Sequence, residues 1–430
     1  MGFSNSLISY TTVVAFAIIL AFQPYALSQR TAERSSRANF QVLYTFKSIE
    51  EGAFPEGTLI QDASGTLYGI AAIGVHGNCG TDESDGCGLV FKLTKAGRKT
   101  DLHDFNGVDG SVLMAGVVRD DAGNFYGTTM FGGTGSCFDP TANGCGTVFK
   151  LNKSGKETVL HRFTGKSDGA FPAAGVTLDA TGNLYGTTCG CGLVSDDLYG
   201  KVFKLDAAGH ETVLHSFTSG EDGASPQAGL LRDAAGNLYG TTYYGGGDGC
   251  SDGQGVGCGI VFKIDTHGNE TVLYRFTGGG DGGAPYAGLI QDATGNLYGT
   301  TYYGGDLNCN ELALPGCGVV FKLRLNGNET VLHTFTGGTD GAFPVAGLVQ
   351  DETGNLYGTT FIGGDPSCSS QGPPGCGVVF KLGPTGHETV LHSFTGGADG
   401  ASPGFGSLLR DASGNLYGTN SAGVVFGLTP

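Results

Sequence analysis

The sequence predicts an all-β fold, a seven-bladed β-propeller built from four-stranded antiparallel blades. Three observations predict it. One unit recurs along the chain, each unit holds four short strand-like segments between glycine turns, and the two ends of the chain supply complementary parts of one unit. A four-stranded sheet repeated at a fixed period is the blade of a propeller.

A phenylalanine that ends a Val-Leu-x-x-Phe segment marks each repeat. Four of the six intervals between these phenylalanines are 59 residues long, and the other two are 58 and 54. A period of this length is typical of propellers and other repeat architectures. The seven markers are Phe46, Phe105, Phe163, Phe217, Phe276, Phe335 and Phe394.

The four segments of one repeat are short and rich in Val, Leu, Phe, Tyr and Thr, as strands are. In one repeat they cover residues 228–233, 238–242, 259–264 and 272–276. Glycines at the turns between them supply positive φ without steric cost. No segment has a 3.6-residue apolar period, which excludes a helical solenoid. A β-solenoid is the alternative, and the antiparallel hairpins disfavour it.

The two ends of the chain predict how the ring closes. The repeats begin with a lone fourth strand at residues 42–46 and end with three strands at 408–411, 416–419 and 424–428. One strand plus three completes a seventh blade. Closure of this kind removes open sheet edges, which would otherwise invite aggregation.

Composition excludes some classes of partner. The chain has 430 residues, a net charge of −17 and only 23 Lys and Arg. Binding to nucleic acid needs clustered basic residues, and none are present. An anionic membrane surface is disfavoured for the same reason. We expect a monomer.

The N-terminus predicts export. Residues 1–28 lack charged side chains and contain an apolar run of signal-peptide length, too short for a transmembrane span. We expect a signal peptide over residues 1–28, a linker over 29–40 and one propeller domain over 41–430, secreted to an extracellular or periplasmic space. An uncleaved N-terminal anchor is the alternative. No later segment is long and apolar enough to span a bilayer.

The twelve cysteines fall into six pairs, each in the loop between the second and third strands of a blade. In an exported protein this pattern predicts disulfides, and a metal site would need more ligands than each loop offers. Cys189 and Cys191 are separated by a single residue, so a bridge between them would be strained. A redox or free-dithiol state therefore stays open for this pair. The pairs are Cys79 and Cys87, Cys137 and Cys145, Cys250 and Cys258, Cys309 and Cys317, Cys368 and Cys376, and Cys189 and Cys191.

Recurring Gly-Asn-Leu-Tyr-Gly-Thr-Thr, Gly-Cys-Gly-Val-Val-Phe-Lys-Leu and Glu-Thr-Val-Leu-His-Ser-Phe segments resemble the Gloeo/Verruco tandem-repeat family of secreted bacterial proteins. The resemblance covers about residues 40–430. It implies export and surface attachment through a C-terminal anchor, and it brings no catalytic residues. This chain stops at Pro430 without an anchor segment, so we expect secretion.

An acidic residue begins the turn that joins the fourth strand of each blade to the next blade. We expect these carboxylates around one end of the central channel, on the face of the Cys loops. They either form the turns or make a cation site or polar ligand rim, where calcium is the candidate ion; no other cofactor is predicted. The series is Glu51, Asp109, Asp168, Asp222, Asp281, Asp340 and Asp399.

Aromatic residues open the Cys loops. Their faces, beside carboxylates and amides, suit sugar rings, although strand-end aromatics also pack beneath loops. The predicted ligand aromatics are Phe131, Tyr243, Tyr244, Tyr302, Tyr303 and Phe361.

Together these features predict a non-enzymatic exported protein that binds a polysaccharide, an envelope polymer or a surface protein through the Cys-loop face. An extracellular propeller hydrolase or lyase is one alternative, and a structural or adhesion module is another. Histidines at one position of the fourth strand interchange with tyrosines, which indicates packing rather than catalysis.

Overall fold

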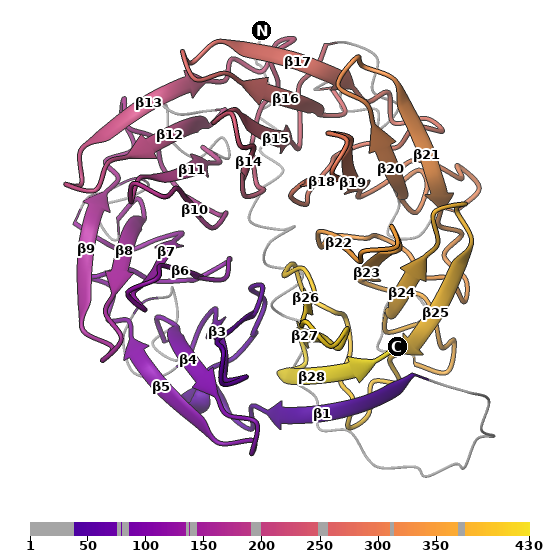
Figure 1. The fold of residues 1–430 in the computed structure, drawn as a ribbon, viewed down its shortest axis with the longest axis horizontal. Coiled ribbons are helices and arrows are strands. Elements are labelled where there is room, and N and C mark those ends of the chain that lie inside the picture. Colours follow the sequence, from indigo (N-terminus) through magenta and orange to yellow (C-terminus); the bar gives the residue numbers. More distant parts are fainter. Residues whose placement is uncertain are drawn as a thin grey trace, which may run out of the picture. The chain divides into compact units, whose positions relative to one another are not determined.

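The computed structural model describes residues 38–74, 79, 86–134, 137, 144–190, 199–247, 257–309, 314–368 and 375–430. The predicted signal peptide lies outside these residues. Residues Ser36–Pro430 form one compact unit. Its seven four-stranded sheets are arranged in a ring (Figure 1), so the predicted seven-bladed propeller is confirmed.

The two inner strands of each blade lie next to the channel. The first strand is only two residues long, shorter than the sequence predicts, because the Ala-Gly residues before it run along the channel. The first strands are β2 (Ile60–Gln61), β6 (Val118–Arg119), β10 (Thr177–Leu178), β14 (Leu231–Arg232), β18 (Ile290–Gln291), β22 (Val349–Gln350) and β26 (Leu409–Arg410). The second strands are β3 (Leu67–Ala71), β7 (Phe125–Thr129), β11 (Leu184–Thr188), β15 (Leu238–Thr242), β19 (Leu297–Thr301), β23 (Leu356–Thr360) and β27 (Leu416–Asn420).

The third and fourth strands form the outer half of each blade, with the fourth on the rim of the ring (Figure 1). The third strands are β4 (Leu89–Leu93), β8 (Thr147–Leu151), β12 (Lys201–Leu205), β16 (Ile260–Ile264), β20 (Val319–Leu323), β24 (Val378–Leu382) and β28 (Val424–Thr429). The fourth strands are β5 (Lys99–Asp104), β9 (Glu157–Arg162), β13 (Glu211–Ser216), β17 (Glu270–Arg275), β21 (Glu329–Thr334), β25 (Glu388–Ser393) and β1 (Asn39–Thr45).

Blades are numbered here from one (β2–β5) to seven (β26–β28 with β1). Blade seven closes the ring as predicted: β1 pairs antiparallel with β28, from Asn39 opposite Thr429 to Thr45 opposite Val424. The N-terminal strand begins at Asn39, two residues before the predicted domain boundary. A single 3₁₀ turn, η1 (Ile49–Glu51), then leads into blade one.

The marker phenylalanines join the blades. Each packs edge-on against the phenylalanine of the third strand in the next blade, a favourable geometry for aromatic pairs. Ring centroids lie between 5.0 and 5.4 Å apart. The pairs are Phe46–Phe91, Phe105–Phe149, Phe163–Phe203, Phe217–Phe262, Phe276–Phe321, Phe335–Phe380 and Phe394–Phe426.

The Asp-x-x-Gly-Asn turns between the first and second strands are held by their aspartates. In blade six the Oδ1 atom of Asp351 accepts the backbone N–H groups of Thr353 and Asn355, and Oδ2 accepts the hydroxyl of Tyr357. Burial alone would raise the pKa of Asp351, but these hydrogen bonds outweigh it and hold the pKa below its ordinary value. The same aspartate–tyrosine contact occurs in all seven blades.

Candidate functional site

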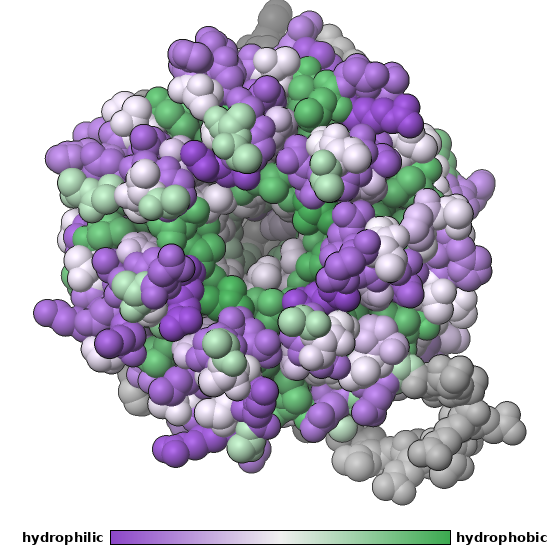
Figure 2. Space-filling model, viewed as in Figure 1, coloured by the Kyte–Doolittle hydropathy of each residue, from purple (hydrophilic) through white to green (hydrophobic). Residues whose placement is uncertain are grey.

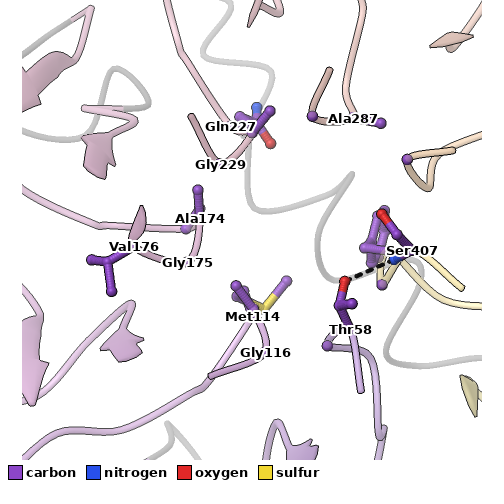
Figure 3. A pocket seen from close by; sticks show the side chains of 18 of the residues that line it. Thr58, Met114, Gly116, Ala174, Gly175, Val176, Gln227, Gly229, Ala287 and Ser407 are labelled. Carbon is purple, nitrogen blue, oxygen red and sulfur yellow. Dashed lines mark hydrogen bonds between the residues drawn. The ribbon is translucent and has the colours of Figure 1, made fainter. Parts of the chain in front are cut away.

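The central channel contains a pocket of about 270 Å³, lined by the segments that precede the first strands (Figure 3). These segments share the pattern Pro-x-Ala-Gly, with departures in blades one, two and seven. The last position of the pattern forms a ring of small residues around the pocket. Its members are Thr58, Gly116, Gly175, Gly229, Gly288, Gly347 and Ser407.

Glycine is required in this ring where neighbouring backbones touch. A Cβ on Gly116 would lie 2.1 Å from the carbonyl oxygen of Thr58, whereas a Cβ on Gly229 would lie 3.7 Å from the carbonyl oxygen of Gly175. At the junction of blades seven and one the backbone N–H of Ser407 donates to the hydroxyl of Thr58 at 2.9 Å (Figure 3). This ring of small residues is therefore mostly backbone, and it is packed closely where blades one and two meet.

The x position of the pattern supplies the larger side chains. Six of its seven residues line the pocket, and Figure 3 shows Met114 and Gln227 among them. In repeats that are otherwise close copies, this position carries a different residue in each of the seven blades. The residues, from blade one to blade seven, are Glu56, Met114, Ala173, Gln227, Tyr286, Val345 and Phe405. Sequence reasoning missed this position, although its variation between blades was visible.

Aromatic rings form a continuous arc beside the pocket. Tyr286 of blade five lies 5.1 Å from Phe405 of blade seven and 5.9 Å from Tyr243 of blade four, between ring centroids. Phe405 in turn stacks with Phe361 at 6.5 Å, and Tyr243 lies 6.4 Å from Tyr302. Three of the predicted ligand aromatics, Tyr243, Tyr302 and Phe361, are therefore brought together with two pocket residues.

The other predicted aromatics lie elsewhere on the same loops. Tyr303 is buried against the core, Tyr244 packs edge-on against Tyr243 at 4.5 Å, and Phe131 packs on Phe171 at 5.4 Å in blades two and three. Phe131 is thus separate from the arc. Apolar surface gathers around the central hollow in Figure 2, with polar residues towards the outside of the ring.

Glu56 is the x residue of blade one and is only 6% exposed. Its side chain lies beside Gly404, next to Phe405, and accepts a hydrogen bond from the hydroxyl of Ser421. Burial raises the pKa of Glu56 to about 7, although the Ser421 hydrogen bond opposes this. The negative charge of Glu56 adds to the burial that raises the pKa of Tyr286 above its ordinary value.

The acidic series lies on the Cys-loop side, as predicted. In blade four the backbone N–H of Gly246, in the Cys loop, donates to the carbonyl of Gly220 in the acidic turn at 2.9 Å, and blades two, five and six have the same bond. None of these carboxylates is among the residues that line the pocket. Each instead contacts the His or Tyr of the outer strand before it, because the turn folds back on that strand.

Contacts between the acidic residues and the His or Tyr residues of the outer strands recur in every blade. His392 Nε2 lies 3.1 Å from Asp399 Oδ2, and hydrogen bonds from His392 and Thr395 outweigh burial and lower the pKa of Asp399. The turn-forming role of the acidic residues is therefore observed directly. The pairs are Tyr44–Glu51, His103–Asp109, His161–Asp168, His215–Asp222, Tyr274–Asp281, His333–Asp340 and His392–Asp399.

Five of these pairs each face a glutamate, which lies at the start of the outer strand of the next blade. The Oε1 atom of each is buried and has no hydrogen-bond partner among the described residues. Burial raises the pKa of Glu270 to about 7, and the negative charge of Asp222 raises it further. In blade one the equivalent residue is Lys99, whose Nζ donates to the carbonyl of Glu51 at 2.7 Å. The five glutamates are Glu157, Glu211, Glu270, Glu329 and Glu388.

Four of the predicted disulfides are present, with Cα–Cα distances of 5.1 to 5.8 Å. They are Cys79–Cys87, Cys137–Cys145, Cys309–Cys317 and Cys368–Cys376. Cys189 and Cys258 are also disulfide-bonded, and their predicted partners, Cys191 and Cys250, lie outside the described residues.

The described residues contain no group of three or more His, Cys, Asp or Glu side chains placed to hold a metal ion. They also contain no helix that is long and apolar enough to cross a membrane.

The family model of the Gloeobacter/Verrucomicrobia repeat matches residues 31–188, 81–311 and 199–429, which together span almost the whole propeller. The chain belongs to this repeat family. No curated protein matches it significantly.

Solved structures share the fold at low sequence identity. The extracellular domain of a hybrid two-component system from B. thetaiotaomicron is 13% identical over 91% of this chain, with a TM-score of 0.52; the chain spans 41% of that protein. A gluconolactonase from Xanthomonas campestris is 14% identical over 91% of this chain and 89% of its own, with a TM-score of 0.43. At these identities the likeness of this repeat protein to them concerns the fold alone.

Proposed function

We propose that this repeat protein is an exported, non-enzymatic binding protein that takes a carbohydrate into its central pocket from the Cys-loop side. The ligand would be a sugar unit of an extracellular or envelope polysaccharide. The Cys loops and the acidic turns would form the surface around the entrance.

The variation at the x position carries the proposal. The blades repeat the same strands, turns and phenylalanine contacts, yet the position that faces the pocket holds residues as different as Ala173, Gln227 and Tyr286. A purely structural ring would have no physical need for this variety. Different side chains at one point of each blade convert a symmetric ring into one asymmetric site.

The chemistry of the lining suits a hydroxylated ligand with an apolar face. Tyr286 and Phe405 offer aromatic faces for the C–H face of a sugar ring, while Gln227, Thr58 and Ser407 offer hydrogen-bonding groups. A few polar groups in a mostly apolar cavity are typical of small-molecule sites. The volume of about 270 Å³ lies just below the usual range of such pockets, about 300–1,000 Å³, and suits one sugar unit.

The same lining favours binding over catalysis. Among the described residues that line the pocket there is no Asp, Glu, His, Lys, Arg or Cys. Hydrolases and lyases need a positioned acid, base, nucleophile or metal beside the reacting atoms. Glu56 lies near the pocket, and no second carboxylate or base among the described residues acts on it.

The experiment is a binding screen of the purified, oxidised protein against neutral, amino- and uronic-acid polysaccharides, with calcium and with chelator. Tyr286→Ala is the test variant, and Tyr199→Ala, which removes an exposed tyrosine outside the pocket, is its control. Binding that Tyr286→Ala abolishes and Tyr199→Ala preserves supports the proposal. Binding to no polysaccharide overturns it and favours an adhesion module, and release of sugar products favours the enzyme.

A further inference from the structure

Glu56 is the most buried carboxylate among the described residues. The turn aspartates are satisfied by backbone N–H groups and hydroxyls, and the other buried acid, Asp109, contacts His103 and Asn106. Glu56 has only the hydroxyl of Ser421. A buried carboxylate with one neutral partner is costly, because its charge has lost water without gaining a counter-charge.

The position of Glu56 relates it to the pocket. It occupies the same repeat position as Tyr286 and Phe405, in blades one, five and seven. Its Cα and side chain lie 3.3 to 3.5 Å from the point where a Cβ on Gly404 would stand, directly before Phe405. Its charge acts on Tyr286. Glu56 therefore lies beside the backbone that leads into Phe405, and its charge acts on Tyr286, although Glu56 is not among the residues that line the pocket.

No positive charge balances this carboxylate in the described part of the chain. No Lys, Arg or His there forms an ion pair with Glu56, and burial and Ser421 together account for its pKa. The pocket lining is uncharged, and the protein as a whole carries a net charge of −17. An anionic ligand would meet only repulsion here, whereas a cationic ligand would supply the missing partner.

We propose that the central site takes a sugar that carries a free amine, with its ammonium bound to Glu56 and its ring against Tyr286 and Phe405. This deepens the proposed function and rests on it. An ammonium group donates three hydrogen bonds, and a charge-assisted bond to a carboxylate is roughly twice as strong as a neutral one. The same cation gains from the faces of nearby aromatic rings. N-acetylation removes the positive charge, so an acetylated hexosamine loses both contributions.

The test compares three monosaccharides of similar shape by calorimetric titration at neutral pH: glucosamine, N-acetylglucosamine and glucose. Glucosamine is expected to bind roughly ten- to a hundredfold more tightly than the other two, as for a hydrogen bond to a charged group. Glu56→Gln removes the charge and keeps the shape. Glu50→Gln is the control. Glu50 is exposed in the turn that leads into blade one, and its substitution changes the net charge by the same amount.

We expect Glu56→Gln to abolish the preference for glucosamine and to leave glucose binding unchanged. We expect Glu50→Gln to preserve the preference. Retained glucose binding also shows that the Glu56→Gln protein is folded. Equal affinities for glucosamine and glucose, or a preference that survives Glu56→Gln, overturn this inference while the proposed carbohydrate site stands. Absence of binding to all three sugars and to their polymers overturns both.

Discussion

The rings of Tyr286 and Phe405 lie 5.1 Å apart at an interplanar angle of 35°, although they belong to blades five and seven, which are not neighbours in the ring. Between them blade six presents only Val345 at the same repeat position, a smaller side chain that lets the two rings meet. The asymmetry of the pocket thus depends on the choice of residue at one point in each blade.

This pair should be energetically coupled. Aromatic pairs in tilted or edge-on geometry contribute about 0.5–1.5 kcal/mol beyond the area they bury. A double-mutant cycle with Tyr286→Ala and Phe405→Ala, measured by denaturant unfolding, should give a coupling free energy of that size. Strict additivity of the two substitutions would show that the rings do not interact in solution.

The glycine ring should tolerate a methyl group at one position and not at another. In Gly116→Ala the new Cβ would meet the backbone oxygen of Thr58 at 2.1 Å, and we expect a loss of about 1–3 kcal/mol in unfolding free energy, as for overpacked cores. In Gly229→Ala the nearest atom is 3.7 Å away, an ordinary contact. Equal stability of the two variants would contradict the close packing of blades one and two.

Stability should decrease as the pH rises through neutrality. Glu270, Glu329 and Glu388 have pKa values raised from 4.5 to about 7 in the folded protein. The folded state therefore binds more protons than the unfolded state between these values, so the unfolding free energy falls as the pH rises across this window.

Thermal unfolding between about pH 5 and about pH 8 measures this slope. Replacing the three glutamates together by glutamine should flatten the slope relative to the parent protein. The comparison with the parent cancels the opposite effect of His215, whose pKa burial lowers. Glu352→Gln, an exposed glutamate paired with Arg410, is the control. An unchanged slope in the triple variant would rule out these glutamates as its source.

The Cys-loop disulfides should stabilise the ring without shaping the pocket. For a bridge with a sequence separation of 8, such as Cys368–Cys376, the chain-entropy model gives about 2.5 kcal/mol. The double variant Cys368→Ser and Cys376→Ser should lose about that much unfolding free energy while retaining ligand affinity. If ligand affinity fell by more than the lower stability of the variant can explain, this loop would be part of the binding site.

Much of the fold could be predicted from the sequence, because a propeller repeats its local patterns. The seven phenylalanine markers, the split blade whose fourth strand contains Val42, and the cysteine spacings each predicted a contact that the structure shows. The candidate site was harder to predict. Residues that recur with the period of the repeat stabilise the blades, as Asp399 does by contacting His392.

The pocket residues depart from the period of the repeat, so no repeating pattern indicates them. Which residues meet across the channel depends on how the ring closes, and pairs such as Tyr286 and Phe405 lie too far apart in the chain for any spacing to indicate. The burial of Glu56 was likewise invisible, because nothing in the local sequence around it distinguishes it from an exposed turn acid.

The stoichiometry of sugar binding tests the central claim most directly. Seven similar blades would offer several equivalent sites if the loops or the acidic turns bound the ligand, whereas the pocket is a single site at the centre of the ring. Calorimetric titration of the oxidised protein with a short oligosaccharide should give one ligand per chain, and Phe405→Ala should abolish this binding. Several equivalent sites, or one that survives Phe405→Ala, would contradict a function centred on the pocket.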